Sequence, residues 1–232
     1  MISILCSVYN SSANLDNYLR YLNDQFLQEF EVVFVDAHST DDSLKKIKEF
    51  KFRGGITTIV IECGSRLGVY EAWNLAIENC SNDYVMNYNT DDKLYRNALL
   101  TATIYCNLYP HMDVIYSNCH ITSDSNHQQY SGWYLWADAN SKAQLLAGCC
   151  VGPFPVVKKS SLVKYGMFDP SFTISGDYEM WSRMRSKGAK FYKMTEFLGA
   201  YYNNPEGVST KNTPERWELH VMQDTRIREL YA

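Results

Sequence analysis

The sequence predicts an α/β fold with a mostly parallel central sheet flanked by helices. Short runs of β-branched and aromatic residues alternate with amphipathic segments through the first half of the 232-residue chain. Two of these runs end directly in acidic residues, the first at Asp36 and the second at Asp91 and Asp92. In open α/β sheets, ligands bind just beyond the carboxyl ends of the strands. These carboxylates are therefore expected to face a crevice.

The first half follows a β-α-β-α order, which predicts right-handed crossovers between parallel strands. Ser39 and Asp42 have the spacing of a capping box ahead of a helix that runs to about Phe52. Gly54 and Gly55 form the turn after it. The expected strands are 2–8, 31–36, 56–61 and 84–88, and the other helices are 15–26, 69–80 and 97–109.

The second half is less regular. Its expected elements are a strand at 114–116, a polar loop at 122–129, a strand-loop segment at 145–157, a helix at 175–187, short strands at 190–194 and 198–202, and a loop at 203–213. Pro214 then opens a last helix that reaches about Leu230. Trp217, Val221, Ile227 and Leu230 are its candidate packing residues. No linker divides the chain, so we expect one domain over residues 1–232.

Composition excludes several classes of protein. The net charge of −4 and the lack of a basic block argue against a nucleic-acid partner. No apolar stretch approaches the roughly 20 residues of a membrane span. A strand is expected directly after Met1, so we expect no secretory signal. The seven scattered cysteines form no CxxC pair, so we expect buried thiols in a cytoplasmic protein, without a zinc site or a disulfide framework.

The adjacent acids Asp91 and Asp92 point to a cation. Two like charges about 4 Å apart repel by roughly 4 kcal/mol at an effective dielectric constant near 20. A divalent ion reverses the sign of that interaction, and oxygen ligands suit Mg²⁺ or Mn²⁺.

Five segments, taken in order, resemble the inverting glycosyltransferases of family 2. They are Ser7 to Asn10, Val35 to Asp41, Arg66 to Asn74, Asn89 to Asp92 and Gly176 to Arg183. The resemblance implies the GT-A fold, a Rossmann-like sheet with a smaller acceptor-side subregion and a C-terminal helix. It also implies a donor-binding half over about 1–110, an acceptor and catalytic half over about 111–202, and a helical extension over about 203–232.

The resemblance assigns three residues to the nucleotide-sugar donor. Tyr9 would stack on the base, although packing beneath its own loop is an equal alternative. Asp36 would accept a hydrogen bond from a base N–H or a ribose hydroxyl, the alternative being a helix cap. Arg66 would contact the diphosphate, or else lie in solvent. Ala37 and His38 replace an acid and a glycine of the family's usual segment, which leaves the base undetermined.

Asn89 to Asp92 match the DxD region of the family, with asparagine in place of the first acid. Asp91 and Asp92 are the candidate metal ligands, with Asp91 also next to the donor. One of the two would bind the metal that bridges the donor's phosphates, and the other would contact ribose or a metal-bound water. A bound Mn²⁺ or Mg²⁺ would neutralise charge on the departing diphosphate. An exposed turn ahead of the following helix is the alternative.

Asp177 matches the catalytic base of the family, the alternative being a simple N-cap. On the same helix Glu179 and Arg183 have the spacing of an ion pair, exposed or bracing. Asn74 is expected to brace loops. The small residues of 148–154 would leave room for an acceptor sugar, or else form an irregular edge strand. Three histidines at 120, 127 and 220 lack ligand spacing and receive no role.

The predicted function is a metal-dependent, inverting transfer of a sugar from a nucleotide-diphospho-sugar to a hydroxyl acceptor. The acceptor implied by the family is a glycan or a lipid-linked sugar in polysaccharide or glycan assembly, with peripheral membrane association through that acceptor. One alternative is a nucleotide-sugar-binding protein without turnover, which Asn89 and Ala37 suggest. The other is a sugar nucleotidyltransferase, although no basic, glycine-rich loop follows the first strand.

Overall fold

The structure is a computed structural model that describes residues 1–139, 141–207, 210–211 and 213–232. Its strands are β1 (Ile2–Val8), β2 (Phe30–Asp36), β3 (Ile56–Glu62), β4 (Tyr84–Asn87), β5 (Lys93–Leu94), β6 (Val114–Thr122), β7 (Gly132–Tyr134), β8 (Val156–Lys158) and β9 (Phe191–Tyr202). Its helices are α1 (Ser12–Asn23), α2 (Ser43–Glu49), α3 (Val69–Asn79), α4 (Ala98–Leu108), α5 (Lys142–Ala147), α6 (Lys159–Tyr165), α7 (Gly176–Ser186) and α8 (Pro214–Tyr231).

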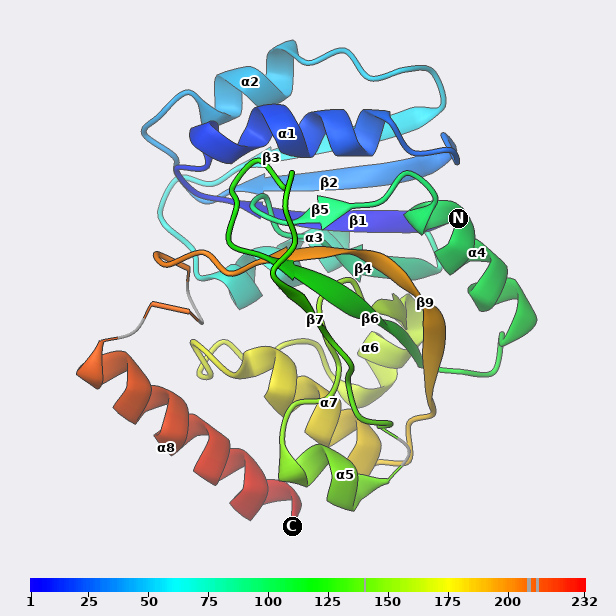
Figure 1. Ribbon diagram of the computed structural model, residues 1–232, viewed down its shortest axis with the longest axis vertical. Coiled ribbons are helices and arrows are strands. Elements are labelled where there is room, and N and C mark those ends of the chain that lie inside the picture. Colours follow the sequence, from blue (N-terminus) through cyan, green and yellow to red (C-terminus); the bar gives the residue numbers. More distant parts are fainter. Residues whose placement is uncertain (140, 208–209, 212) are drawn as a thin grey trace.

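All of these strands join one sheet, shown in Figure 1, with the order β3-β2-β1-β4-β8-β6-β9-β5 and with β7 paired to β6. Strands β3, β2, β1 and β4 are mutually parallel. Strand β8 is antiparallel to both β4 and β6, whereas β6 and β9 are parallel. The predicted α/β class with a mostly parallel sheet flanked by helices is therefore confirmed.

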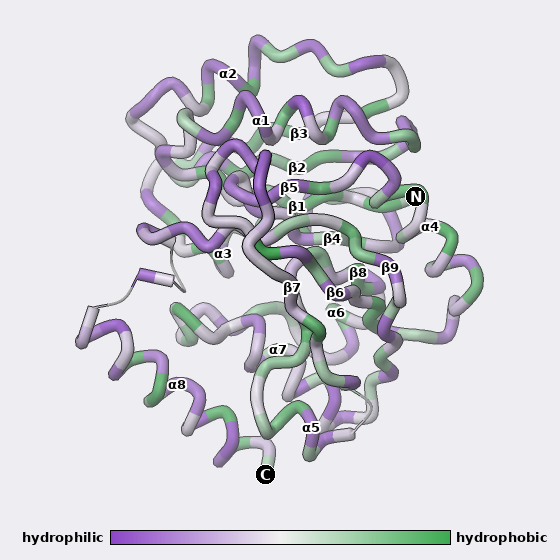
Figure 2. The backbone as a smooth tube through the Cα atoms, viewed as in Figure 1, coloured by the Kyte–Doolittle hydropathy of each residue, from purple (hydrophilic) through white to green (hydrophobic). Residues whose placement is uncertain are grey.

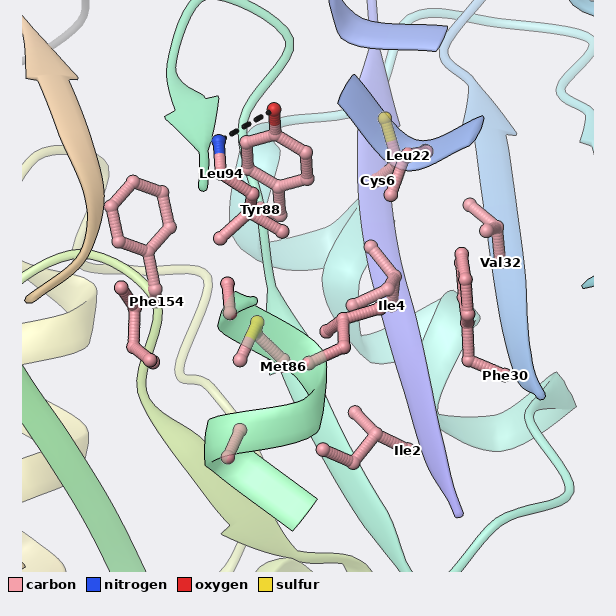
Figure 3. Packing of buried hydrophobic residues seen from close by; sticks show 14 of the residues in the cluster. Ile2, Ile4, Cys6, Leu22, Phe30, Val32, Met86, Tyr88, Leu94 and Phe154 are labelled. Carbon is pink, nitrogen blue, oxygen red and sulfur yellow. Dashed lines mark hydrogen bonds between the residues drawn. The ribbon is translucent and has the colours of Figure 1, made fainter. Parts of the chain in front are cut away.

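The core has two layers, one on each face of the sheet. Along β1, Ile4 and Cys6 pack with residues of α1 and α4, whereas Leu5 packs with residues of α3 on the opposite face. Figure 3 shows the first layer, in which Tyr88 also accepts a hydrogen bond from the Leu94 amide (3.2 Å). Because both faces are covered, the central strands are apolar at nearly every position, as is usual for parallel sheets.

The first half differs from the prediction mainly at helix starts. Helix α1 begins at Ser12, three residues early, and α2 is short. The predicted capping box of α2 is wrong, since Asp42 makes no side-chain cap. The Asp41 carboxylate instead accepts from the amides of Ser12 and Ser43, and thereby joins the starts of α1 and α2. Local sequence signals cannot choose among neighbouring acids when a long-range partner decides.

The second half differs more. The segment 145–157 was expected to be a strand and loop, but it begins inside α5 and ends in β8. Helix α6 and strands β5 and β7 were not predicted. The two short strands after residue 189 are a single strand, β9, whose pairing with β6 shifts register twice. Those irregularities explain why the alternation of side chains breaks off within the strand. Part of the predicted loop 203–213 lies outside the described residues.

Helix α8 lies beside α7, with its C-terminal end near α5 (Figure 1). Trp217, Val221 and Leu230 are exposed, so the predicted packing role is wrong for these three and right for Ile227, which is buried. Gln223 also faces inward, where its Oε1 accepts from two backbone amides ahead of α7. Hydrophilic and hydrophobic residues alternate along α8 (Figure 2), which is why apolar spacing did not identify its inner face.

The seven cysteines are free thiols, and five of them are buried. Among the described residues, no helix combines the length and the apolar character that crossing a bilayer requires.

Candidate active site

A cavity of about 660 Å³ lies beyond the carboxyl ends of β1 and β4. It is lined by the loops after these strands, the first turns of α3 and α7, and residues of α8. Tyr9, Arg66, Asp91 and Asp177 all line it, so the structure brings together four of the predicted site residues. The sequence predicts a donor-binding half that ends near residue 110, but Asn204 and other residues from the second half also line this cavity.

Tyr9 and Arg66 meet at one end of this cavity. The Arg66 guanidinium carbon lies 3.4 Å from the centroid of the Tyr9 ring, a close cation–π contact. The loop is held from behind, where the Asn10 amide donates to Ser39 Oγ (3.0 Å) and Asn10 Oδ1 accepts from the Thr40 amide (2.8 Å). Tyr9 keeps 37% of its surface exposed, so it does not pack beneath its loop. The pair presents an aromatic face and a positive charge together.

Asp36 lies behind this end and does not line the cavity. The side chain is buried, and its Oδ2 accepts from the Ser39 amide (3.1 Å), which shapes the loop. The other oxygen, Oδ1, is buried and has no hydrogen-bond partner within the described part of the chain. His38 adopts a left-handed φ of 68°, so the loop keeps a conformation that favours glycine. The observed role of Asp36 is thus in loop structure, and a nucleoside contact stays a prediction that requires Oδ1 to become accessible.

Asp91 and Asp92 have different surroundings, although they are adjacent in the loop after β4. Asp91 lines the cavity, and its Oδ2 accepts from Asn204 Nδ2 (2.9 Å). Asp92 is only 1% exposed, does not line the cavity, and accepts from the Tyr202 amide through Oδ1 (2.9 Å). Burial and the neighbouring charge of Asp91 raise the pKa of Asp92 well above its usual range. The geometry therefore favours Asp91 as the residue that would bind a metal and does not support Asp92 as a second ligand.

A single carboxylate still fits a hard divalent cation. Mg²⁺ is commonly bound through one or two carboxylates, together with water and substrate phosphates. Asp91 supplies one such carboxylate beside a cavity with a positive charge at Arg66. Among the described residues, no cluster of three or more His, Cys, Asp or Glu side chains forms a ready-made metal cage. The residues thus fit a cation that is completed by the phosphates of a ligand.

Asp177 lies in the first turn of α7, whose N-cap residue is Ser175. Its Oδ1 accepts from the Tyr178 amide (2.9 Å) and faces the Tyr70 hydroxyl (3.3 Å). That hydroxyl also donates to the Ile174 carbonyl (2.7 Å). At Gly176 a Cβ would lie 2.7 Å from the Tyr70 ring, so glycine permits this approach. Asp177 is therefore held by the ring and its own turn, and it is not the N-cap.

Burial raises the pKa of the Asp177 carboxyl above its ordinary value. The raised pKa makes the carboxylate a stronger base than an ordinary aspartate. Asp177 lines both the large cavity and a second cavity of about 400 Å³. The Asp177 carboxylate, with its raised pKa, therefore borders both cavities.

The second cavity has an aromatic wall. Tyr134 and Trp136 stack with their ring centroids 4.9 Å apart, and Trp181 also lines the space. Gly152 lies against the indole of Trp136, where a Cβ would come within 2.9 Å of Cδ1 and closer still to Nε1 and Cε2. The small residue expected to leave room for a sugar thus makes room for a tryptophan that forms the wall. No regular strand covers 148–154.

Two bracing predictions are confirmed. Asn74 exchanges hydrogen bonds with the backbone of Phe168, donating to its carbonyl (2.8 Å) and accepting from its amide (3.0 Å). Arg183 and Glu179 form a buried ion pair (2.8 Å). The guanidinium also donates to the carbonyl of Met167 (2.6 Å), and to those of the two residues before it. These contacts fix α7, and hence Asp177, to the turn before it.

Tyr70 and Asn204 are among the site residues that escaped the sequence analysis, as are Tyr134 and Trp136 of the aromatic wall. Tyr70 falls within the matched segment 66–74, so its aromatic character there was a usable signal. Asn204, which donates to Asp91, follows β9 in a loop with no pattern that marks it. Only the fold brings residue 204 beside residue 91.

Known proteins resemble this chain in sequence and in fold. The sequence model of Glycosyl transferase family 2 matches residues 3–165. The amylovoran biosynthesis glycosyltransferase AmsB of Erwinia amylovora is 24% identical over 207 residues, which cover 86% of this chain and 69% of that protein. A GalNAc(5)-diNAcBac-PP-undecaprenol beta-1,3-glucosyltransferase of Campylobacter jejuni is 24% identical over 174 residues, or 74% of this chain and 55% of that protein.

Solved structures share the fold. The crystal structure of S. aureus TarS 1–349 in complex with UDP superposes with a TM-score of 0.75 at 17% identity, covering 100% of this chain and 66% of that one. The mannosyltransferase PcManGT from Pyrobaculum calidifontis, in complex with GDP-Man and Mn²⁺, gives a TM-score of 0.72 at 15% identity, covering 98% and 62%. The chain thus spans between about half and two thirds of the length of several proteins it matches.

Proposed function

Because this chain belongs to glycosyl transferase family 2, we propose that it moves a sugar from a nucleotide-diphospho-sugar to a hydroxyl acceptor, with inversion at the anomeric carbon. The position of Asp177 carries the proposal. It lines both a cavity with an aromatic ring, a cation and a carboxylate, and a second cavity with an aromatic wall. The first set of groups suits a nucleoside diphosphate, and the second suits the apolar face of a sugar.

The proposed reaction is a single displacement. The acceptor hydroxyl attacks the anomeric carbon as the bond from that carbon to the diphosphate oxygen breaks, and the nucleoside diphosphate leaves. Asp177 takes the proton of the attacking hydroxyl. Its hydrogen bonds with described residues fall on Oδ1, which leaves Oδ2 for that proton. The carboxylate enters the step ionised and ends it neutral, a change that its burial favours.

On the donor side, Tyr9 would stack on the base and Arg66 would pair with the diphosphate. Asp91 would hold the divalent ion, Mn²⁺ or Mg²⁺, which when bound neutralises charge on the departing diphosphate. The structural neighbour in complex with GDP-Man and Mn²⁺ supports a metal of this kind. Neighbours in complex with UDP and with GDP-Man support uracil and guanine as candidate bases of the donor, beside thymine.

The acceptor proposed from the sequence is a glycan or a lipid-linked sugar, with a role in polysaccharide or glycan assembly and with membrane association through the acceptor. The Erwinia relative, a glycosyltransferase of amylovoran biosynthesis, and the Campylobacter relative, which is named for an undecaprenol-linked sugar, support this class. A cytoplasmic location is likewise proposed, and the seven free thiols support it. Asn89, which lines both cavities, is the residue that suggests the alternative of a binding protein without turnover, and release of nucleoside diphosphate would distinguish the enzyme from it.

The test begins with a panel of nucleotide-sugars, screened by thermal shift with Mn²⁺ and with Mg²⁺. With the donor found, Asp177→Asn should keep donor affinity while release of nucleoside diphosphate falls by roughly 10²- to 10⁴-fold. The control is Asp16→Asn, which alters an exposed ion pair with Lys46 that lines neither cavity. Turnover by Asp177→Asn at the wild-type rate would remove this residue from the reaction.

A further inference from the structure

The loop between β6 and β7 is braced by its own hydrogen bonds. Thr122 Oγ1 donates to the Gln129 carbonyl (2.5 Å) and so closes the loop. The Asp124 carboxylate accepts from the backbone amides of Asn126 (2.9 Å), Gln128 (2.7 Å) and Gln129 (3.2 Å). These bonds restrain the backbone of the loop.

The residue that this loop presents is His127. Its φ is 55°, its side chain is buried at 3% exposure, and its amide donates to the Asp124 carbonyl (2.9 Å). The ring Nε2 lies 2.8 Å from the backbone carbonyl oxygen of Asp91. A carbonyl only accepts, so Nε2 carries the proton, and Nδ1 then accepts from the Tyr21 hydroxyl of α1 (3.3 Å). His127 thus has a left-handed backbone conformation, and its ring nitrogens contact both the Asp91 carbonyl and the Tyr21 hydroxyl.

These contacts hold Asp91 from outside the cavity. His127 lines neither cavity, whereas Asp91, whose carbonyl it contacts, lines the larger one. On the cavity side Asn204 binds the Asp91 side chain, and on the far side His127 binds its main chain. Lys93, just beyond the acids, donates through Nζ to the His127 carbonyl (3.2 Å), so the loop is tied to the chain on both sides of Asp92.

We propose that His127 is a positioning residue for Asp91, holding the main chain of the loop 89–92 so that the Asp91 carboxylate is already placed for the cation and diphosphate. This inference rests on the proposed function of Asp91. Groups that orient a metal ligand from outside commonly change metal affinity about 10- to 100-fold when they are removed. His127 acts on the backbone of the ligand residue, so we expect the lower end of that range.

The first experiment uses the metal-free protein. Hydrogen exchange of the amides of 89–92 should be about tenfold faster in His127→Asn, because asparagine tolerates the left-handed φ but cannot make both ring contacts. His120→Asn is the matched control, since His120 also meets a tyrosine hydroxyl, that of Tyr95 (2.6 Å), and lines neither cavity. Equal exchange at 89–92 in wild type and His127→Asn would overturn the proposal.

The second experiment measures nucleoside diphosphate binding by calorimetry, with and without Mn²⁺. His127→Asn should weaken binding about tenfold with Mn²⁺ and leave it unchanged without, whereas His120→Asn should match wild type in both. Tyr21→Phe, which removes only the outer hydroxyl, should show a smaller loss of the same kind. Faster exchange with unchanged Mn²⁺-dependent affinity would refute positioning while leaving the proposed function intact. If wild type bound nucleoside diphosphate with the same affinity with and without Mn²⁺, both the metal role of Asp91 and the inference built on it would be refuted.

Discussion

Replacing Gly152 with alanine should displace Trp136 and thereby damage the wall of the second cavity. The added Cβ would come within 2.9 Å of Cδ1 of the indole and still closer to Nε1 and Cε2. Carbon atoms pack at about 3.5 to 4.0 Å, so the ring would have to retreat by more than about 1 Å.

The indole cannot make that retreat freely. The Trp136 amide donates to Asn118 Oδ1 on β6 (2.9 Å), and Lys193 Nζ on β9 donates to the Trp136 carbonyl (2.5 Å). The ring also stacks on Tyr134. With the backbone held at both ends, the side chain must leave its rotamer or push the segment around Gly152 outward. Overpacking of this kind costs about 1–3 kcal/mol of stability.

A double-mutant cycle in urea unfolding isolates this clash. Gly152→Ala should lose about 1–3 kcal/mol in the wild-type background and close to nothing in a Trp136→Ala background, where the ring is absent. Gly148→Ala is the control from the same segment, because its Cβ would meet no atom within 4 Å and its φ of 165° is extended backbone. An equal loss for Gly152→Ala in both backgrounds would refute the reasoning. Donor affinity should not change, since Gly152 lines only the second cavity.

Asp91→Asn should abolish Mn²⁺-dependent donor binding in calorimetry, whereas Asp92→Asn, whose side chain is buried, should retain it; loss in both variants would contradict the different surroundings seen here. Burial raises the pKa of Asp177, so this base becomes protonated at a higher pH than an ordinary aspartate. As the pH is lowered, kcat/KM should therefore begin to fall earlier than it would with an unperturbed aspartate as the base. The pKa of Asp177 is higher in the folded than in the unfolded state, so keeping this carboxylate ionised at neutral pH lowers the free energy of unfolding. Asp177→Asn should therefore raise the melting temperature at neutral pH. Arg183→Met should lose about 3–5 kcal/mol in urea unfolding by leaving Glu179 buried and unpaired, and a loss below about 1 kcal/mol would show that the pair does not brace α7.

Local patterns in the sequence determined the order of strands and helices in the first half, because apolar periodicity reports directly on burial within one element. They also located Asp91 and Asp177 at an element end, and the spacing of Glu179 and Arg183 predicted their ion pair. Each of these features depends on residues a few positions apart, so one stretch of chain contains the whole signal.

Only the tertiary structure decided which side chains face one another. Asp91 and Asp92 are identical residue types at adjacent positions. The Asp92 carboxylate is buried and accepts a hydrogen bond from the Tyr202 amide, whereas Asp91 lines the cavity. The inner face of α8 and the contact of His127 with the Asp91 carbonyl likewise depend on partners from distant segments. The physical reason is that burial and hydrogen-bond partners are properties of the packed chain, and no local run of residues records which distant group will arrive beside it.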